Sequence, residues 1–197
     1  MSITQKLKKG AAWTLGRALP IQKNKVVFSS FYGRGASDNP KAIVDALAQR
    51  PEKLDIVWLA KDPSHAGVPD NVRVVPYDTP AAIRELSTAR VWVDNCRKGA
   101  HVKKDGQYYM QTWHGFALKR IERDVADKLN TPENAAYAEY AKRDSAQIDA
   151  IISNSTFMTE IYQKSFWYHG AVLEYGSARN DILVHPPADA KHQVQQA

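Results

Sequence analysis

The sequence predicts an α/β domain with a mostly parallel, Rossmann-like sheet and flanking helices. Two observations predict this fold class. Short runs rich in Val, Ile and aromatic residues alternate with segments of helical periodicity from residue 25 onward, and such alternation is typical of parallel sheets. Most of these runs are also nearly continuous in apolar residues, as expected of strands that are covered on both faces. A chain of 197 residues can build one such domain with a proper core.

The expected elements follow this alternation. Strands are expected at residues 25–30, 54–60, 72–76, 90–95, 107–113, 149–154 and 171–176. Helices are expected between them, at residues 39–49, 79–88, 133–147 and 155–166. Three of these helices have good start signals: Asn39 and Thr79 each precede a proline, and Ser155 heads another helix.

The two ends of the chain differ from this body, which spans residues 25–185. Residues 1–24 predict a basic amphipathic helix that ends at Pro20, with Trp13 close to an apolar face of Ile3, Leu7, Ala11, Leu15 and Leu19. Such a helix can lie on an anionic membrane surface. The alternatives are a solvated helix packed on its own domain and a frayed terminus. Residues 186–197 are expected to be a polar tail or the start of an interdomain linker.

Composition argues against several classes of protein. The single cysteine, Cys96, allows no intramolecular disulfide and no cysteine-rich metal site. The sequence lacks a run near the roughly 20 apolar residues that span a bilayer and lacks a signal-peptide core, so we expect the chain inside the cell. The first 25 residues hold six Lys or Arg and no acid. The rest is balanced, which argues against nucleic acid as a partner. We expect no metal site, because the histidines lack metal-ligand spacing, and we expect no cofactor. The absence of G-x-S-x-G argues against a Ser-His-Asp hydrolase.

Polar residues gather after the expected strands, where the ligands of open α/β sheets bind. The apolar run at 107–113 is followed directly by His114 and Gly115. A histidine in this place can approach a ligand and act as a general base. The alternative is a histidine that only caps the strand. Lys119 and Arg120, expected just inside a following helix, would favour an anionic ligand.

Several of these segments together resemble the CDP-glycerol glycerophosphotransferase family, whose members build the polyol-phosphate polymers of teichoic acids and some capsules. The resemblance runs from about Val26 to Leu183 through SFYGRGASDNPKAIVDAL, WLAKDP, YYMQTWHGFALKRI, DAIISNS and LEYGSARNDIL. It implies the N-terminal, acceptor-side domain of a GT-B transferase. It also implies transfer of glycerol phosphate from CDP-glycerol to a hydroxyl of a lipid-linked polyol-phosphate acceptor. CMP would be released at the cytoplasmic face of a bacterial membrane.

The resemblance implies roles for particular residues. His114 would be the catalytic base, and the residues lining the CDP-glycerol site would be Gly115, the backbone of Phe116, Ala117 and Leu118, and Arg179. Supporting roles fall to Asp38 and Asn39, expected to cap the first helix of the body, and to Asn180 and Asp181, expected to hold the loop that aims Arg179. The family's H-G-T is His-Gly-Phe here and its following proline is Ala117, so a hydroxyl that could touch phosphate is lost.

The resemblance also implies a missing half, because a GT-B enzyme needs a second Rossmann domain for most of its nucleotide contacts. We therefore expect this chain to need a C-terminal donor domain in cis or in trans, and to turn over slowly or not at all without it. Two alternatives stay open. The chain can be a non-catalytic module that attaches to anionic membranes or polymer, or a fragment of a GT-B glycosyltransferase that uses a nucleotide sugar.

Overall fold

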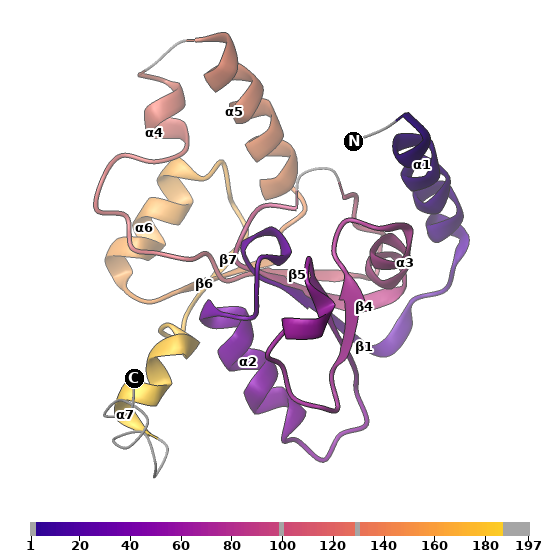
Figure 1. Ribbon diagram of the computed structural model, residues 1–197. Helices are drawn as coiled ribbons and strands as arrows, with labels where there is room; N and C mark the ends of the chain where they lie inside the picture. The colour runs from indigo at the N-terminus through magenta and orange to yellow at the C-terminus, as the bar shows by residue number, and fades with distance from the viewer. Residues whose placement is uncertain (1–2, 99–100, 129–130, 187–197) are drawn as a thin grey trace.

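The computed structural model describes residues 3–98, 101–128 and 131–186, which form one α/β unit (Figure 1). At its centre is a sheet of seven parallel strands in the order β3-β2-β1-β4-β5-β6-β7. The predicted fold class is confirmed, and each of the seven expected strands is present. They are β1 (Gln22–Ser29), β2 (Asp55–Ala60), β3 (Arg73–Pro76), β4 (Ala89–Asp94), β5 (Tyr108–Gln111), β6 (Ala150–Ser153) and β7 (Ala171–Glu174).

The four expected helices of the body are also present. Two of them start as predicted: the Thr79 hydroxyl accepts a hydrogen bond from the Ala82 amide at 3.2 Å, and the Ser155 hydroxyl accepts one from the Met158 amide at 3.3 Å. The helices of the described residues are α1 (Ile3–Ala18), α2 (Asp38–Ala48), α3 (Pro80–Thr88), α4 (Arg123–Ala126), α5 (Pro132–Ser145), α6 (Thr156–Ser165) and α7 (Asp181–Val184), with 3-10 turns η1 (Phe31–Gly33), η2 (Pro63–His65) and η3 (Ala178–Asn180).

The helices cover the two faces of the sheet unequally. On one face, α2 packs over Phe28 and Trp58 of the neighbouring strands β1 and β2. On the other face, α3 and α6 cover a second apolar cluster built on Trp92, Tyr109 and Ile151. Figure 1 shows α2 and the short α7 on one side of the sheet, with the helices α1, α3, α4, α5 and α6 on the opposite side. Each face of the sheet therefore has its own apolar cluster, and more helices lie on the α3 and α6 side than on the α2 side.

The amphipathic helix α1 lies along α3 (Figure 1). Trp13 points inward, with its ring 5.0 Å from that of His101, while Leu7 and Leu15 are 69% and 70% exposed. The sequence predicted Trp13 close to the Leu7–Leu15 face. That placement is wrong, because Trp13 and the buried Gly16 form a second face that packs onto the domain. None of the helices in the described part of the chain is long and apolar enough to cross a membrane.

Candidate functional site

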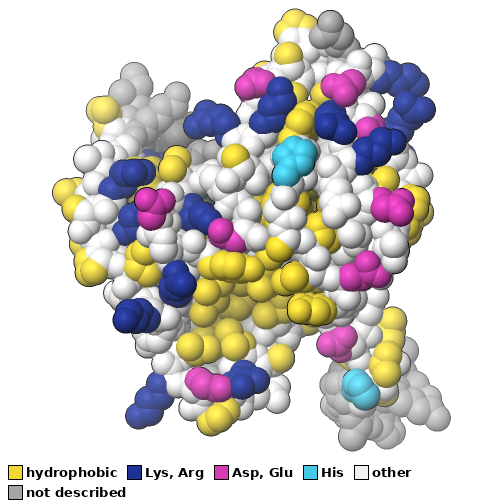
Figure 2. All heavy atoms as spheres, turned by 180° about the vertical axis from the view of Figure 1, so that it is seen from behind, with side chains coloured by type: hydrophobic (Ala, Val, Ile, Leu, Met, Phe, Trp, Pro, Cys, Tyr) yellow, Lys and Arg dark blue, Asp and Glu magenta, His cyan; other side chains and the backbone are white. Residues whose placement is uncertain are grey.

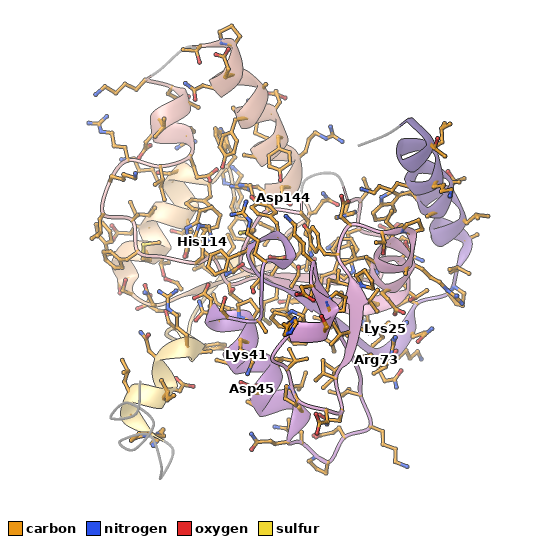
Figure 3. The ribbon with its side chains drawn as sticks, in the orientation of Figure 1. Lys25, Lys41, Asp45, Arg73, His114 and Asp144 are labelled. Atoms are coloured by element: carbon orange, nitrogen blue, oxygen red, sulfur yellow. The ribbon has the colours of Figure 1, made fainter. Side chains whose placement is uncertain are left out.

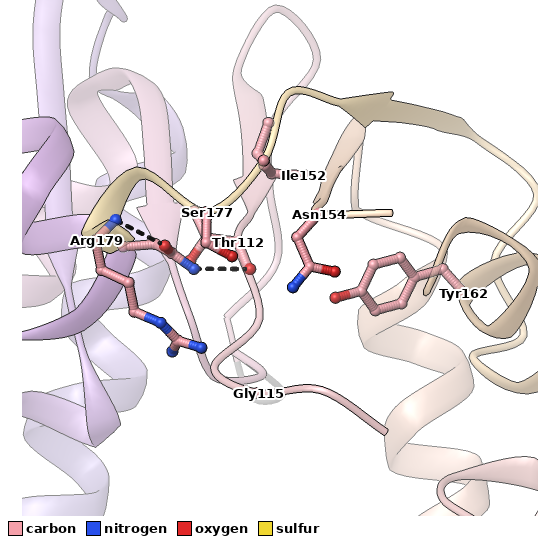
Figure 4. A pocket seen from close by; sticks show the side chains of 9 residues that line it. Thr112, Gly115, Ile152, Asn154, Tyr162, Ser177 and Arg179 are labelled. Atoms are coloured by element: carbon pink, nitrogen blue, oxygen red, sulfur yellow. Dashed lines mark hydrogen bonds between the residues drawn. The ribbon is translucent and has the colours of Figure 1, made fainter. Parts of the chain in front are cut away.

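The site lies where the carboxyl ends of the strands meet. A small polar pocket there is lined by Thr112 and Gly115 after β5, Asn154 after β6, and Ser177 and Arg179 after β7 (Figure 4). Tyr162 of α6 and Asn39 of α2 complete its wall. The structure thus brings together polar residues that are far apart in the sequence, at the edge that the strand pattern predicted.

His114 is half-buried beside this pocket, and its ring is held in one orientation. Its Nδ1 lies 2.6 Å from the backbone oxygen of Asn95. A carbonyl oxygen can only accept a hydrogen bond, so Nδ1 carries the proton and the lone pair is on Nε2. The ring stacks on Trp113 at 4.4 Å and meets the edge of Phe31 at 5.7 Å. These contacts hold the ring with Nδ1 on the carbonyl, so Nε2 is the nitrogen through which the ring can exchange a proton with a ligand.

The backbone around His114 is strained. Trp113, Phe31, Tyr32 and Asp38 all have φ between 44° and 63°, in the left-handed region that non-glycine residues seldom adopt. Each such residue costs of order 1–3 kcal/mol, and such residues cluster at functional sites. Local contacts offset part of this cost: the Trp113 amide donates to Gln111 Oε1 at 2.9 Å. The segment carrying His114 is therefore held in a defined conformation by the surrounding fold.

Arg179 reaches the same segment from η3. Its Nη1 pairs with the carboxylate of Asp38 and donates to the backbone oxygen of His114 at 3.1 Å. The other oxygen of Asp38 accepts from Asn95 Nδ2 at 2.6 Å. The Asp38 side chain is only 4% exposed, whereas that of Arg179 is 35% exposed. Asp38 therefore joins the arginine to the residue whose carbonyl orients His114.

Asp38 and Asn39 do not cap α2, so that prediction is wrong. The residue at the cap position of α2 is Ser37, and the helix begins at Asp38. The φ angle of Asp38 is 63°. This backbone turns both side chains toward the site. Asn39 Oδ1 accepts from the Arg179 amide at 3.2 Å, and its Nδ2 is 3.4 Å from the Thr112 oxygen (Figure 4). Asn39 thus ties η3 to the end of β5.

Asn95 also belongs to this network, although no role for it was predicted from the sequence. It follows β4 directly and is completely buried, and its Oδ1 accepts from the Phe31 amide at 2.9 Å. The signal in the sequence was an amide side chain at the end of an apolar strand, next to the expected ligand edge. Asn180 and Asp181 lie in η3 and α7 at the exposed border of the site, where Asn180 N donates to Ser177 O at 2.8 Å.

The segment after Gly115 is irregular, and the helix expected to contain Lys119 and Arg120 is absent there. The next helix, α4, begins at Arg123. The Ala117 amide donates to the Met158 sulfur at 3.3 Å, which ties this irregular segment to α6. Lys119 and Arg120 are both exposed. In the described residues of this segment, no helix begins next to His114. Any positive charge that this segment offers to an anionic ligand therefore comes from the side chains of Lys119 and Arg120.

The four residues 115–118 border a groove of about 500 Å³ that opens beside His114. Phe116 and Leu118 are exposed, and the Phe116 ring stacks on Phe157 of α6 at 5.2 Å. The aromatic ring that replaces the family's threonine therefore rests on α6. Gly115 lines both this groove and the polar pocket.

A buried ionic cluster lies next to Trp113, the residue before His114. Arg97 pairs with Glu122 at 2.9 Å and with Asp144 at 3.2 Å, and its guanidinium lies 5.8 Å from the Trp113 ring. Burial raises the pKa of the neighbouring Cys96 thiol to about 11, so this thiol is protonated at neutral pH and is a poor nucleophile. Within the described ranges, no three acidic, His or Cys residues are grouped in a way that could hold a metal ion. The candidate base is His114, which lines the groove next to the pocket.

The fold and site define a class: a parallel α/β domain that places a histidine and an arginine at the ligand edge of its sheet. The chain belongs to the CDP-glycerol:poly(glycerophosphate) glycerophosphotransferase family, whose model matches residues 12–197. It is 31% identical over 175 residues to the teichoic acid poly(glycerol phosphate) polymerase of Staphylococcus epidermidis, covering 87% of this chain and 24% of that protein. It is also 31% identical over 176 residues to the teichoic acid glycerol-phosphate transferase of Staphylococcus aureus, covering 86% and 44%.

Solved structures extend this likeness to the fold. The wall teichoic acid polymerase TagF superposes with a TM-score of 0.83 at 28% identity, over 99% of this chain and 52% of that chain. A TagF variant soaked with CDPG gives 0.84 at 27% identity, with the same coverage. TagF has a GT-B-like fold, in agreement with the predicted fold class. The chain thus spans about a quarter to a half of the relatives it matches.

Proposed function

We propose that this chain is the catalytic-base half of a transferase. The reaction moves glycerol phosphate from CDP-glycerol to a hydroxyl of a lipid-linked polyol-phosphate acceptor, in the synthesis of a teichoic acid or capsule polymer. The observation that carries the proposal is the hydrogen bond from His114 Nδ1 to the Asn95 carbonyl, which leaves Nε2 as the ring nitrogen available to a substrate in the groove that His114 lines. Family membership supplies the substrate class.

The residues fit the chemistry of this transfer. The acceptor hydroxyl oxygen attacks the phosphorus that bears glycerol, its proton passes to His114 Nε2, and the bond from that phosphorus to the CMP oxygen breaks. CMP leaves with the electron pair of the broken bond. Arg179 stabilises the negative charge on the phosphoryl oxygens, a role suited to its planar fork of donors. Phosphoryl transfer depends mainly on positioning and electrostatics, so a covalent nucleophile is not required.

The site lining in this proposal is that of the family. Gly115 and the backbone of Phe116, Ala117 and Leu118 contact CDP-glycerol, and Gly115 allows the close approach. Phe116 brings no hydroxyl to the phosphate, so contacts to the donor come from backbone and from Arg179. Asp38 and Asn39 position Arg179, and Asn180 and Asp181 hold the turn that carries it.

Completion of the site requires a second domain. The chain matches 52% of the TagF chain, and we propose that a C-terminal donor domain, in cis or in trans, supplies most contacts to the nucleotide. The isolated 197-residue chain then turns over slowly or not at all.

A peripheral position at the cytoplasmic face of a bacterial membrane completes the proposal. The two relatives described above are bacterial proteins of teichoic acid synthesis. On α1, Leu7 and Leu15 are exposed on the side away from the packed Trp13, and the exposed Lys8 follows Leu7 directly. An apolar stripe flanked by positive charge suits the interface of an anionic bilayer.

The test is release of CMP from CDP-glycerol with a lipid-linked glycerol-phosphate acceptor, with and without the C-terminal half of the Staphylococcus epidermidis polymerase. We expect release only with the added half, and none with His114→Ala. The matched control is His169→Ala, which removes an exposed histidine outside the site. If folded protein released no CMP in any of these reactions, the result would favour a non-catalytic module that binds membrane or polymer. Turnover of UDP- or GDP-sugars in preference to CDP-glycerol would favour a glycosyltransferase.

A further inference from the structure

A second groove lies beside the one that opens at His114. It has a volume of about 300 Å³, and its lining includes Arg120 and Glu122 before α4, Val125 and Ala126 of α4, and Asn134 and Tyr137 of α5. Trp113 and Ile121 line both grooves, so the two are neighbours. We propose that this α4–α5 groove binds the polyol-phosphate unit of the acceptor that precedes the reacting one. The inference rests on the proposed function, because that function places the reacting hydroxyl at His114.

The carboxylate of this groove, Glu122, is fixed in place. Its side chain is 4% exposed. Its Oε2 accepts a hydrogen bond from Arg97 Nη2 at 2.9 Å, and its Oε1 accepts one from the Tyr137 hydroxyl at 2.6 Å. Each carboxylate oxygen can accept a second hydrogen bond. Glu122 and Tyr137 both line the groove, so a hydroxyl of a bound polyol finds oriented acceptor oxygens there.

The backbone at Glu122 is strained in a way that charge pairing does not require. Its φ is 54° and its ψ is −121°, a conformation that non-glycine residues seldom adopt, and Trp113 also has a positive φ, of 51°. Such residues cluster at functional sites. Arg97 has a second carboxylate partner in Asp144, at 3.2 Å. In Figure 3, Asp144 and His114 both lie on the side of the molecule that carries α5 and α6. The strain at Glu122 is therefore explained by the shape of the groove better than by the ion pair alone.

Arg120 supplies positive charge to the α4–α5 groove. It is exposed and lines this groove, whereas its neighbour Lys119 lines the groove of His114. Figure 2, seen from behind Figure 1, shows Lys and Arg side chains gathered over the end of the molecule that carries α4 and α5. A guanidinium binds phosphate through two parallel N–H donors. The rest of the wall is largely apolar and includes Ile121, Val125 and Ala126.

A polyol phosphate matches these three kinds of group. Its phosphate diester carries a negative charge, its hydroxyls donate hydrogen bonds, and its CH and CH2 groups are apolar. A polymer repeats this unit, so successive phosphates can lie near the successive cations Lys119 and Arg120 while the terminal hydroxyl lies at His114. The acceptor chain then passes α4 and α5 and ends at the base.

Binding of a soluble acceptor mimic tests the groove without turnover. A glycerol phosphate trimer is titrated into the 197-residue chain while 1H–15N NMR follows the indole N–H of Trp113, which lines the groove. We expect this signal to shift, and we expect Arg120→Gln to raise the Kd about tenfold, since it removes a charge-assisted contact. Ala126→Phe, which fills the groove, should raise the Kd as well. The matched control is Lys128→Gln, which removes an exposed cation that does not line the groove and should leave the Kd unchanged.

Three results would overturn the inference. The first is the absence of trimer binding by the natural chain. The second is equal weakening by Arg120→Gln and Lys128→Gln, which would show a general attraction between charges. The third is tighter binding of a short-chain, water-soluble phosphatidylglycerol than of the trimer, which would assign the groove to a lipid headgroup.

Kinetics with the added C-terminal half of the Staphylococcus epidermidis polymerase separate this inference from the proposed function. Arg120→Gln should raise the KM for the acceptor and leave the KM for CDP-glycerol unchanged; a raised KM for CDP-glycerol alone would assign Arg120 to the donor instead. His114→Ala should release no CMP and still bind the trimer. Trimer binding without CMP release from the natural chain would refute the transfer and leave the groove, whereas CMP release with an unchanged acceptor KM in both Arg120→Gln and Ala126→Phe would refute the groove alone.

Discussion

Replacement of Asp38 tests whether the network around His114 is built as the structure shows. Asp38 has two partners, the Arg179 guanidinium and the buried Asn95 amide, and its backbone φ is 63°. Asparagine tolerates this left-handed conformation and keeps one acceptor oxygen for Asn95. Alanine tolerates it poorly and keeps neither contact. The two variants therefore remove different parts of the same arrangement, and their free energies of unfolding must differ.

The expected loss in the free energy of unfolding can be estimated for each variant from the contacts of Asp38. Arg179 is 35% exposed, so water replaces much of its lost partner and Asp38→Asn should cost about 1 kcal/mol. In Asp38→Ala the completely buried Asn95 amide also loses its acceptor, which adds roughly 2 kcal/mol. Alanine at positive φ adds roughly 1 kcal/mol more. We expect Asp38→Ala to cost about 4 kcal/mol in total, and Asp38→Gly, which relieves only the backbone strain, about 3 kcal/mol.

Urea unfolding of the three variants, followed by circular dichroism, measures these differences. The order of stability should be the natural chain, then the Asn, Gly and Ala variants. Arg179→Met is the matched control, because it removes the ion pair and leaves Asp38 bound to Asn95. If the Asn and Ala variants unfold within about 0.5 kcal/mol of each other, Asp38 neither holds Asn95 nor adopts the left-handed conformation, and the positioning argument is refuted.

Three further predictions concern neighbouring groups. Two-bond 1H–15N NMR should show His114 with its proton on Nδ1, since Nδ1 lies 2.6 Å from the Asn95 carbonyl; a proton on Nε2 would contradict the general-base geometry. Arg97→Met should lower the free energy of unfolding by about 3–5 kcal/mol, because it removes the buried cation that pairs with both Glu122 and Asp144; a loss below 1 kcal/mol would be inconsistent with this pairing. Burial lowers the pKa of His101 to about 3, so between pH 6.5 and 3 the unfolded chain binds a proton at His101 that the folded chain does not. Stability is then complete above pH 6.5 and falls as the pH drops, by up to about 1.4 kcal/mol per pH unit, and unfolding curves of His101→Gln should be flatter in this range.

The sequence predicted the sheet because each strand carries its own signal. Runs such as residues 54–60 are apolar on both faces, and the caps Thr79 and Ser155 mark helix starts within three residues of the amides they bind. These are local properties, and local patterns were sufficient to predict seven strands and four helices. The position of the site followed from the same reasoning, because a parallel sheet brings the carboxyl ends of its strands to one edge.

The contacts within the site could not be predicted in the same way. Asp38 and Arg179 are 141 residues apart in the sequence, and a pairing over that distance depends on the finished fold. The capping prediction for Asp38 was wrong because an aspartate before a proline-containing helix fits a cap locally, whereas tertiary contacts hold it in a left-handed conformation. The helix expected after Gly115 is also absent, and the segment that takes its place contacts α6 through the bond from the Ala117 amide to Met158, a contact that the local sequence does not indicate.

The hydrogen bonds of Arg179 leave part of its guanidinium group available to an anion. Among the described contacts, Nη1 alone serves both Asp38 and the His114 oxygen, which leaves the edge formed by Nε–H and Nη2–H for a ligand. That edge presents two parallel donors, the arrangement that binds a phosphate in a bidentate way. A phosphate can therefore bind without breaking the pair with Asp38, and the arginine pays little ordering entropy because it is already held. The same carboxylate, through Asn95, fixes the carbonyl that orients His114, so one buried acid positions both groups of the proposed mechanism, the arginine proposed to bind phosphate and the histidine proposed as the base.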